Sequence, residues 1–165
     1  MQVSIEWLHD YIDFKETAEE LADKYTMAGV PVENVVRADR GLDKVVTGRI
    51  EKLEPNPDSD HLLVCQMNVG QKELVTIQTG ADNVHQGDIV PVALVGAHLP
   101  NGLKIAKGKL RGIVSNGMLC SAGELKLDES NLTEEQKDGI YILPPDTPVG
   151  IPASKALGLD GVILE

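Results

Sequence analysis

Six short apolar segments follow one another between residues 45 and 120, and they constrain the fold more than any other feature. Clusters of asparagine, aspartate, glycine and proline separate them, and these residues favour turns. The segments are residues 45–53, 62–69, 74–79, 89–95, 107–114 and 118–120. So many short strands at short intervals predict a small β-barrel or β-sandwich.

The beginning of the chain instead carries helical patterns. Ser4 can cap a short helix at 5–12, where apolar residues recur at helical spacing. Thr17 and Glu20 form a capping-box pattern, in which each side chain can bond the backbone amide of the other residue. This pattern predicts a helix at 18–28.

Both ends of the chain are acidic, whereas its middle is neutral. Residues 1–39 and residues 116–165 each carry three basic and nine acidic side chains, and residues 40–115 carry nine basic and eight acidic ones. The helical N-terminal segment and the short C-terminal segment are each too small for a core of their own, since about 40 residues is the usual lower limit without disulfides or metal. We therefore expect one discontinuous small α+β domain with the barrel inserted in it.

The total charge of -11 argues against a nucleic-acid partner, but its distribution changes that conclusion. No acidic side chain occurs between Asp88 and Glu124, a stretch that holds four cations. They are Lys104, Lys107, Lys109 and Arg111. Along a strand at 107–114, residues two apart share a face, so the last three cations would form one row. Such a row suits a phosphate backbone, although lysines also protect solvated edge strands from aggregation.

Other motifs have simple structural explanations. Asn116-Gly117 lies between two apolar runs and predicts a two-residue hairpin turn. Asp58 and Asp60 fit a turn better than a metal site, because further ligands at a defined spacing are missing. The sequence contains no nucleotide-binding loop, no nucleophile motif and no apolar run long enough to span a membrane. We therefore expect no catalytic residue and no metal.

The two cysteines form neither a disulfide framework nor a zinc-binding spacing. Cys65 lies in an alternating strand pattern, where a packed thiol is the usual state. Cysteine usage of this kind predicts a cytoplasmic location, with Cys65 and Cys120 reduced and slow to react.

Several segments carry a resemblance to a known family. Residues 3–8 and 25–33 are similar to the start of the β subunit of bacterial phenylalanyl-tRNA synthetases. Three segments in the middle resemble the tRNA-binding OB-fold module of that subunit, and two later segments also fit the β-subunit pattern. They are residues 57–62, 79–84 and 109–121, followed by 139–144 and 148–150. The resemblance covers essentially the whole chain.

The resemblance implies a five-stranded OB-fold barrel at 40–150, inserted in a split N-terminal α+β domain of residues 1–39 and 151–165. The apolar segment that ends the chain fits a longer polypeptide. The complete enzyme would be an α2β2 tetramer that uses ATP and magnesium to attach phenylalanine to tRNA. Its aminoacylation site lies in the α subunit, so the resemblance implies no cofactor in this chain. The implied partners are tRNA, the remainder of the β subunit and the α subunit, with no membrane.

Carried over residue by residue, the resemblance also predicts the RNA contacts, to which the charge pattern adds Lys104. The full set is Asn83, Lys104, Lys107, Lys109, Arg111, Ser115, Asn116, Met118 and Ser121. Two departures from the family weaken the attraction to RNA. His61 stands where the family usually has lysine, and Asp82 stands where it has a small residue or proline.

Three functions are compatible with this sequence. The first is an accessory tRNA-binding region of a synthetase, and the second is a barrel that positions neighbouring domains and touches RNA little. The third is a free-standing tRNA-binding or chaperone-like protein. Residues 26–140 contain no tryptophan, tyrosine or phenylalanine, so binding there could not stack bases on such rings. It would depend on RNA shape and phosphate charge.

Overall fold

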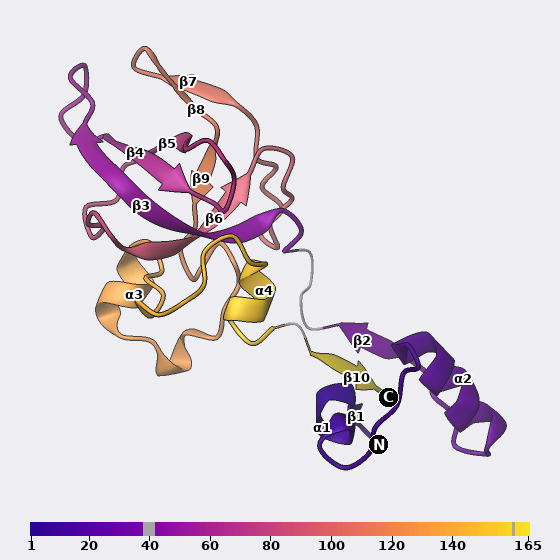
Figure 1. Cartoon of the computed structure of the whole chain (residues 1–165). Helices are drawn as coiled ribbons and strands as arrows, with labels where there is room; N and C mark the ends of the chain where they lie inside the picture. Colours follow the sequence, from indigo (N-terminus) through magenta and orange to yellow (C-terminus); the bar gives the residue numbers. More distant parts are fainter. Residues whose placement is uncertain (38–41, 160) are drawn as a thin grey trace. The chain divides into compact units, whose positions relative to one another are not determined.

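The computed structural model describes residues 1–37, 42–159 and 161–165 (Figure 1). The chain divides into two compact units, a small unit of Met1–Arg40 with Leu157–Glu165 and a barrel unit of Gly41–Ala156. The expected boundary between residues 39 and 40 lies outside the described residues. The α+β fold class, with a five-stranded barrel inserted in a discontinuous unit, is confirmed.

The small unit brings the first and the last segments of the chain into one antiparallel sheet. Its strand order is β1-β10-β2, with β10 in the centre. The elements are β1 (Val3–Ser4), α1 (Ile5–His9), α2 (Ala18–Met27), β2 (Val35–Arg37) and β10 (Val162–Leu164). Helix α2 begins as predicted, because Thr17 Oγ1 accepts from the Glu20 amide and the Glu20 carboxylate accepts from the Thr17 amide. Helix α1 is shorter than the helix predicted at 5–12.

The barrel unit contains a five-stranded antiparallel sheet of order β5-β4-β3-β6-β9. Its strands are β3 (Val45–Pro55), β4 (Leu63–Asn68), β5 (Val75–Thr79), β6 (Ile89–Leu94) and β9 (Gly117–Leu119). The Asn116 amide donates to the Thr76 carbonyl at 2.8 Å, which joins the two edges of the sheet and nearly closes the barrel.

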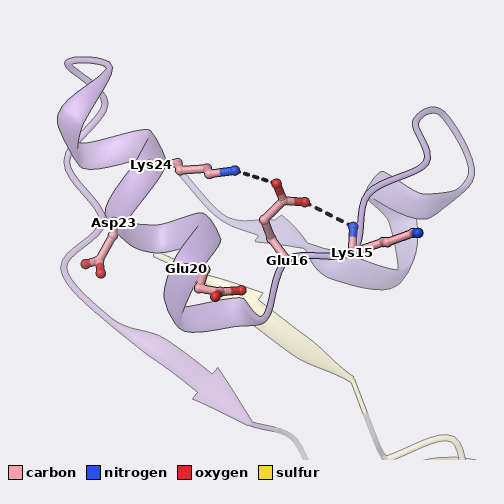
Figure 2. A pocket seen from close by; sticks show the side chains of 5 residues that line it. All are labelled: Lys15, Glu16, Glu20, Asp23 and Lys24. Atoms are coloured by element: carbon pink, nitrogen blue, oxygen red, sulfur yellow. Dashed lines mark hydrogen bonds and ion pairs between the residues drawn. The ribbon is translucent and has the colours of Figure 1, made fainter.

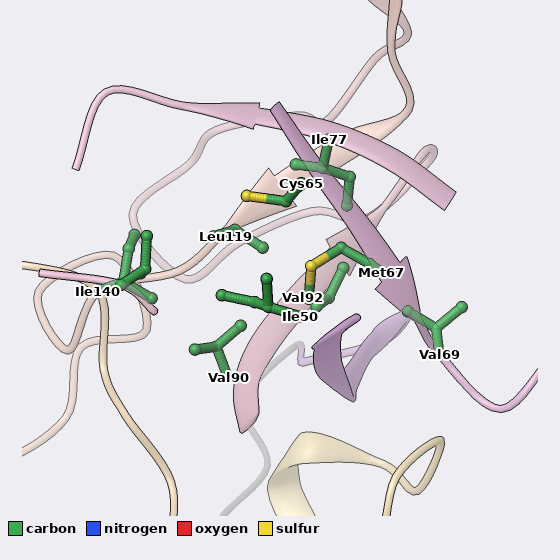
Figure 3. Packing of buried hydrophobic residues seen from close by; sticks show 10 residues of the cluster. Ile50, Cys65, Met67, Val69, Ile77, Val90, Val92, Leu119 and Ile140 are labelled. Carbon is green, nitrogen blue, oxygen red and sulfur yellow. The ribbon is translucent and has the colours of Figure 1, made fainter. Parts of the chain in front are cut away.

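The barrel core consists of aliphatic and sulfur-containing side chains. Figure 3 shows them pointing toward one another from β3, β4, β5, β6 and β9. Ile50, Met67 and Ile77 are fully buried at its centre. Gly48 permits this packing, because a Cβ there would stand 2.7 Å from a methyl group of Val92.

After β9 the chain crosses the barrel without adding a strand. It forms the 3-10 turn η1 (Glu129–Asn131), helix α3 (Glu134–Asp138) and helix α4 (Ala153–Ala156). Residues 139–143 form only isolated bridges, at Ile140 and Leu143. Residues 151–156, which the sequence assigned to the split domain, belong to the barrel unit because the Thr47 amide donates to the Ile151 carbonyl at 2.9 Å.

The single strand predicted at 107–114 was wrong. Residues 108–115 form a hairpin of β7 (Gly108–Leu110) and β8 (Ile113–Ser115). Arg111 and Gly112 have φ angles of 47° and 84°, the conformation of a two-residue hairpin turn. Arg111 therefore lies at the tip of the hairpin instead of continuing a row with the lysines.

Asn116-Gly117 does not form the expected hairpin turn. Strand β8 pairs with β7, whereas β9 pairs with β6, so the chain passes from one partner to the other at Asn116. Gly117 has a φ of 147°, and a Cβ there would stand 2.6 Å from the Ala93 carbonyl oxygen. The glycine is required by the close approach of two strands, not by a turn.

Candidate nucleic-acid interface

The predicted cations gather at the β7–β8 hairpin and in the loop before it. Lys109 lies on β7, Arg111 at the tip and Lys107 one residue before β7, and all three are exposed. Lys104 is exposed in the preceding loop, where its backbone forms an isolated β-bridge with His98. These four residues are called the basic hairpin below. Within the described part of the chain, none of the four forms an ion pair. Their charges are therefore available to an anionic partner.

The two faces of the hairpin differ in character. Gly108 and Leu110 line a groove on the barrel, and Lys109 lies between them in the strand. Because alternate residues of a strand point to opposite faces, Lys109 points away from this groove, on the same face as its partner Val114. Figure 1 shows the hairpin projecting beside β5.

The groove collects three of the predicted neutral contacts, Ser115, Met118 and Ser121. It has a volume of about 540 Å³ and is bounded by the end of β5, by β7, by β9 and by residues 137–140. Leu110 and Ile140 give it apolar walls, so Met118 contributes to a mixed and partly apolar surface.

Several of the predicted contacts also hold the barrel together. Both polar atoms of the Asn83 amide bond the backbone of Ile140, donating to its carbonyl at 2.9 Å and accepting from its amide at 3.0 Å. The Ser121 hydroxyl donates to Glu124 at 3.0 Å. Ser115 Oγ accepts from the Gln78 amide at 3.0 Å and donates to the Gly117 carbonyl at 3.2 Å.

Acidic side chains bound the groove on the side of α3. Glu124 and Asp138 line the groove itself, together with Lys137. A second hollow of about 270 Å³ beside Asn83 is lined by four carboxylates, from Asp82, Glu134, Glu135 and Asp138. Because these carboxylates gather there, this side of the groove repels phosphate. The basic hairpin, by contrast, carries cations that attract an anion.

The residues that fix the hairpin on the barrel were missed by sequence reasoning. Gln78 Nε2 donates to the carbonyls of Leu110 and Ile113, at 2.9 and 2.7 Å. Asn56 Nδ2 donates to Gln78 Oε1 at 2.8 Å. The sequence carries no signal for this contact, because alternation with the buried Ile77 assigns Gln78 to the outer face of the strand. The hairpin covers that face.

A charged hollow in the small unit has a volume of about 450 Å³ (Figure 2). It is lined by Lys15, Glu16, Glu20, Asp23 and Lys24. Glu16 forms an ion pair with Lys24 and accepts a hydrogen bond from the Lys15 amide. The Glu16 and Glu20 carboxylates are already engaged, by Lys24 and by the Thr17 amide, so we assign no ligand to this hollow.

The two cysteines, Cys65 and Cys120, are free thiols and both are buried. Burial raises the pKa of Cys65 to about 11 and that of Cys120 to about 12, so neither thiol is a ready nucleophile. In the same residues no group of three or more metal-ligating side chains was found, and no helix is long and apolar enough to cross a membrane.

Comparison with known proteins extends over the whole barrel unit. Residues 45–152 match the family described as "Putative tRNA binding domain". The chain belongs to this tRNA-binding domain family. The match spans all five barrel strands and the β7–β8 hairpin, so both surfaces described above lie within the family's domain.

Relatives of the tRNA-binding domain extend the similarity to the small unit. The chain is 47% identical over all 165 residues to a phenylalanine–tRNA ligase β subunit of Clostridium tetani. It is 48% identical over 164 residues to that of Moorella thermoacetica. The chain covers 20% of the length of each of these relatives. Among solved structures, a MetRS related protein of Pyrococcus horikoshii aligns with 65% of this chain and 85% of its own, at 24% identity and a TM-score of 0.46.

Proposed function

We propose that this chain binds tRNA through its basic hairpin, as an accessory region of the β subunit of a phenylalanine–tRNA ligase. The observation that carries the proposal is that four exposed cations, which form no ion pair with any described residue, lie on the β7–β8 hairpin of a tRNA-binding domain and in the loop before it. The relatives that match the chain along its full length bear the name of that subunit.

The proposed binding depends on phosphate charge. Lys104, Lys107, Lys109 and Arg111 provide at most four phosphate contacts. Each neutralised phosphate contributes roughly 0.7 to 0.9 to the slope of log affinity against log salt, so that slope should be near -3 or shallower. The groove residues Ser115, Met118 and Ser121, together with Asn83 and Asn116, would add neutral contacts to the backbone and sugars.

The proposal assigns the remaining functions to the complete enzyme. There the chain would join the rest of the β subunit and the α subunit in an α2β2 tetramer in the cytoplasm. ATP and magnesium would serve the attachment of phenylalanine to tRNA outside this chain. The contribution of the chain itself would be binding and orientation of tRNA, without catalysis.

Charge reversal at the hairpin tests the proposal. Labelled tRNA is titrated at two salt concentrations against the unaltered chain and against the double variant Lys109→Glu with Arg111→Glu. Both side chains are exposed, so the barrel should remain folded while binding is lost. The matched control is Lys72→Glu with Lys155→Glu, which makes the same change in net charge at exposed sites outside the hairpin.

The control should bind nearly as well as the unaltered chain. Full affinity in the hairpin variant, or binding that does not depend on salt, would mean that the lysines only protect a solvated edge. The structural function, in which the barrel positions neighbouring domains, would then be favoured.

A further inference from the structure

We infer that Gln78 and Asn56 are positioning residues for tRNA binding. They hold the β7–β8 hairpin in the conformation that presents Lys109 and Arg111 to RNA. This inference rests on the proposed function and extends it to two buried residues. Gln78 is 5% exposed and Asn56 is 1% exposed.

The hairpin has little of its own to stabilise it. Each of its strands is three residues long, and all three residues of β7 are exposed. Strand β8 is only partly buried, and a two-stranded hairpin that buries so little is marginally stable in water. Arg111 also has a positive φ, which non-glycine residues seldom adopt, so its turn is disfavoured in isolation. An external support is therefore needed.

Gln78 supplies this support at both ends of the turn. Its Nε2 donates to the carbonyl of Leu110 at 2.9 Å and to that of Ile113 at 2.7 Å, and these two residues flank Arg111 and Gly112. Its Oε1 accepts from Asn56 Nδ2 at 2.8 Å, which fixes the orientation of the amide group. One side chain thus fixes the spacing of the two strands where the tip begins.

Two further contacts continue the support on either side of Gln78. At the base of the hairpin, Ser115 Oγ accepts from the Gln78 backbone amide at 3.0 Å. At the other end, Asn56 Oδ1 accepts from the Asp58 amide at 2.9 Å, which ties the network to the loop after β3. No buried side-chain polar atom lacks a partner among the described residues. The network is satisfied and leaves the cations free to face solvent.

A hairpin held in this way binds RNA without first being ordered. When an interface is flexible in the free protein, binding must also supply the cost of ordering it. Loss of the Gln78 bonds should therefore weaken tRNA binding and reduce the number of phosphates contacted together. This effect is separate from any loss of global stability.

The test uses Gln78→Met, which has a similar volume but no hydrogen-bonding amide. The matched control is Gln66→Met on the neighbouring strand β4, where Gln66 Oε1 accepts from the Thr76 hydroxyl at 3.0 Å and does not contact the hairpin. Three quantities are measured for each protein. They are the urea midpoint, the hydrogen exchange of amides 108–115, and tRNA affinity at two salt concentrations.

We expect Gln78→Met to remain folded, to exchange its hairpin amides faster and to bind tRNA roughly tenfold more weakly. Its salt slope should be shallower by about 1 to 2, as for the loss of one or two phosphate contacts. Gln66→Met should keep the affinity and the slope of the unaltered chain. Should Gln78→Met not fold, Asn56→Ala carries the same prediction, because it removes the donor to Gln78 Oε1 without adding a charge beside the hairpin.

Unchanged affinity and slope in a folded Gln78→Met protein would overturn the inference while leaving the proposed function intact. Equal losses in Gln66→Met would overturn it as well, since the effect would then follow stability. If the unaltered chain does not bind tRNA at low salt, the proposed function fails, and the positioning inference fails with it.

Discussion

Replacing Asn83 by alanine should destabilise the barrel unit through the backbone of Ile140. The Asn83 amide makes two hydrogen bonds to that residue, at 2.9 and 3.0 Å, and Ile140 is only 6% exposed. The substitution leaves one backbone donor and one backbone acceptor without their partner. Ile140 also packs against the main hydrophobic cluster, so its displacement would loosen the core.

The magnitude follows from the two groups left unpaired. A buried polar group without a partner costs about 1 to 3 kcal/mol, and Asn83 is half-buried, so water can reach part of the vacated space. We therefore expect the unfolding free energy to fall by about 2 to 4 kcal/mol. The salt slope of tRNA binding should not change, because a neutral amide displaces no counterion.

Urea denaturation followed by far-UV circular dichroism measures this loss. Tryptophan fluorescence is unsuitable, since Trp7 lies in the small unit and would not report on the barrel. The matched control is Asn101→Ala, which removes one hydrogen bond to the exposed Leu103 amide and should cost less than about 1 kcal/mol. If Asn83→Ala lowers the unfolding free energy by less than about 0.5 kcal/mol, the two backbone groups of Ile140 are not left buried and unpaired, because such groups cost more than this.

Three further predictions concern single positions. Gly117→Ala should destabilise the barrel by about 1–3 kcal/mol in the same urea assay, since its Cβ meets the Ala93 backbone oxygen; native-like stability would contradict this. Cys65 and Cys120 should resist a thiol reagent at pH 8 until urea unfolds the chain. Burial raises the pKa of both thiols above the ordinary 9.0, so stability should be independent of these groups below pH 9 and fall as pH rises further. Asp58→Asn should strengthen tRNA binding a few-fold at low salt, because the Asp58 carboxylate lies beside Gly112 at the hairpin tip. An affinity equal to that of the unaltered chain at every salt concentration would exclude this effect.

Local chemistry made part of the fold predictable. The capping box of Thr17 and Glu20 acts within one helical turn, and helix α2 begins where it predicts. The barrel strands were located to within two residues, because turn-forming clusters separate apolar runs. Both signals depend only on neighbours in the sequence.

The predictions that failed depend on contacts between distant segments. Arg111 takes a positive φ in a hairpin that Gln78 supports from another strand. Because nothing in residues 107–114 themselves indicates this turn, the sequence predicted one continuous strand there. Gly117 is required by the approach of Ala93, yet after an asparagine it resembles a turn glycine. For the candidate site, the sequence predicted the four cations, because they lie in a stretch that contains no acidic side chain. Their supports Gln78 and Asn56 were not, because polar residues in a strand and a turn normally face solvent.

Contact between tRNA and the basic hairpin can be measured as the acetylation rate of each lysine with and without tRNA, followed by mass spectrometry. Bound tRNA should slow acetylation of Lys107 and Lys109 several-fold, with a smaller effect at Lys104. Lys72 and Lys155, which are exposed outside the hairpin, should react at the same rate in both conditions. Equal protection of all lysines from acetylation, or protection that spares Lys107 and Lys109, would contradict tRNA binding at the basic hairpin.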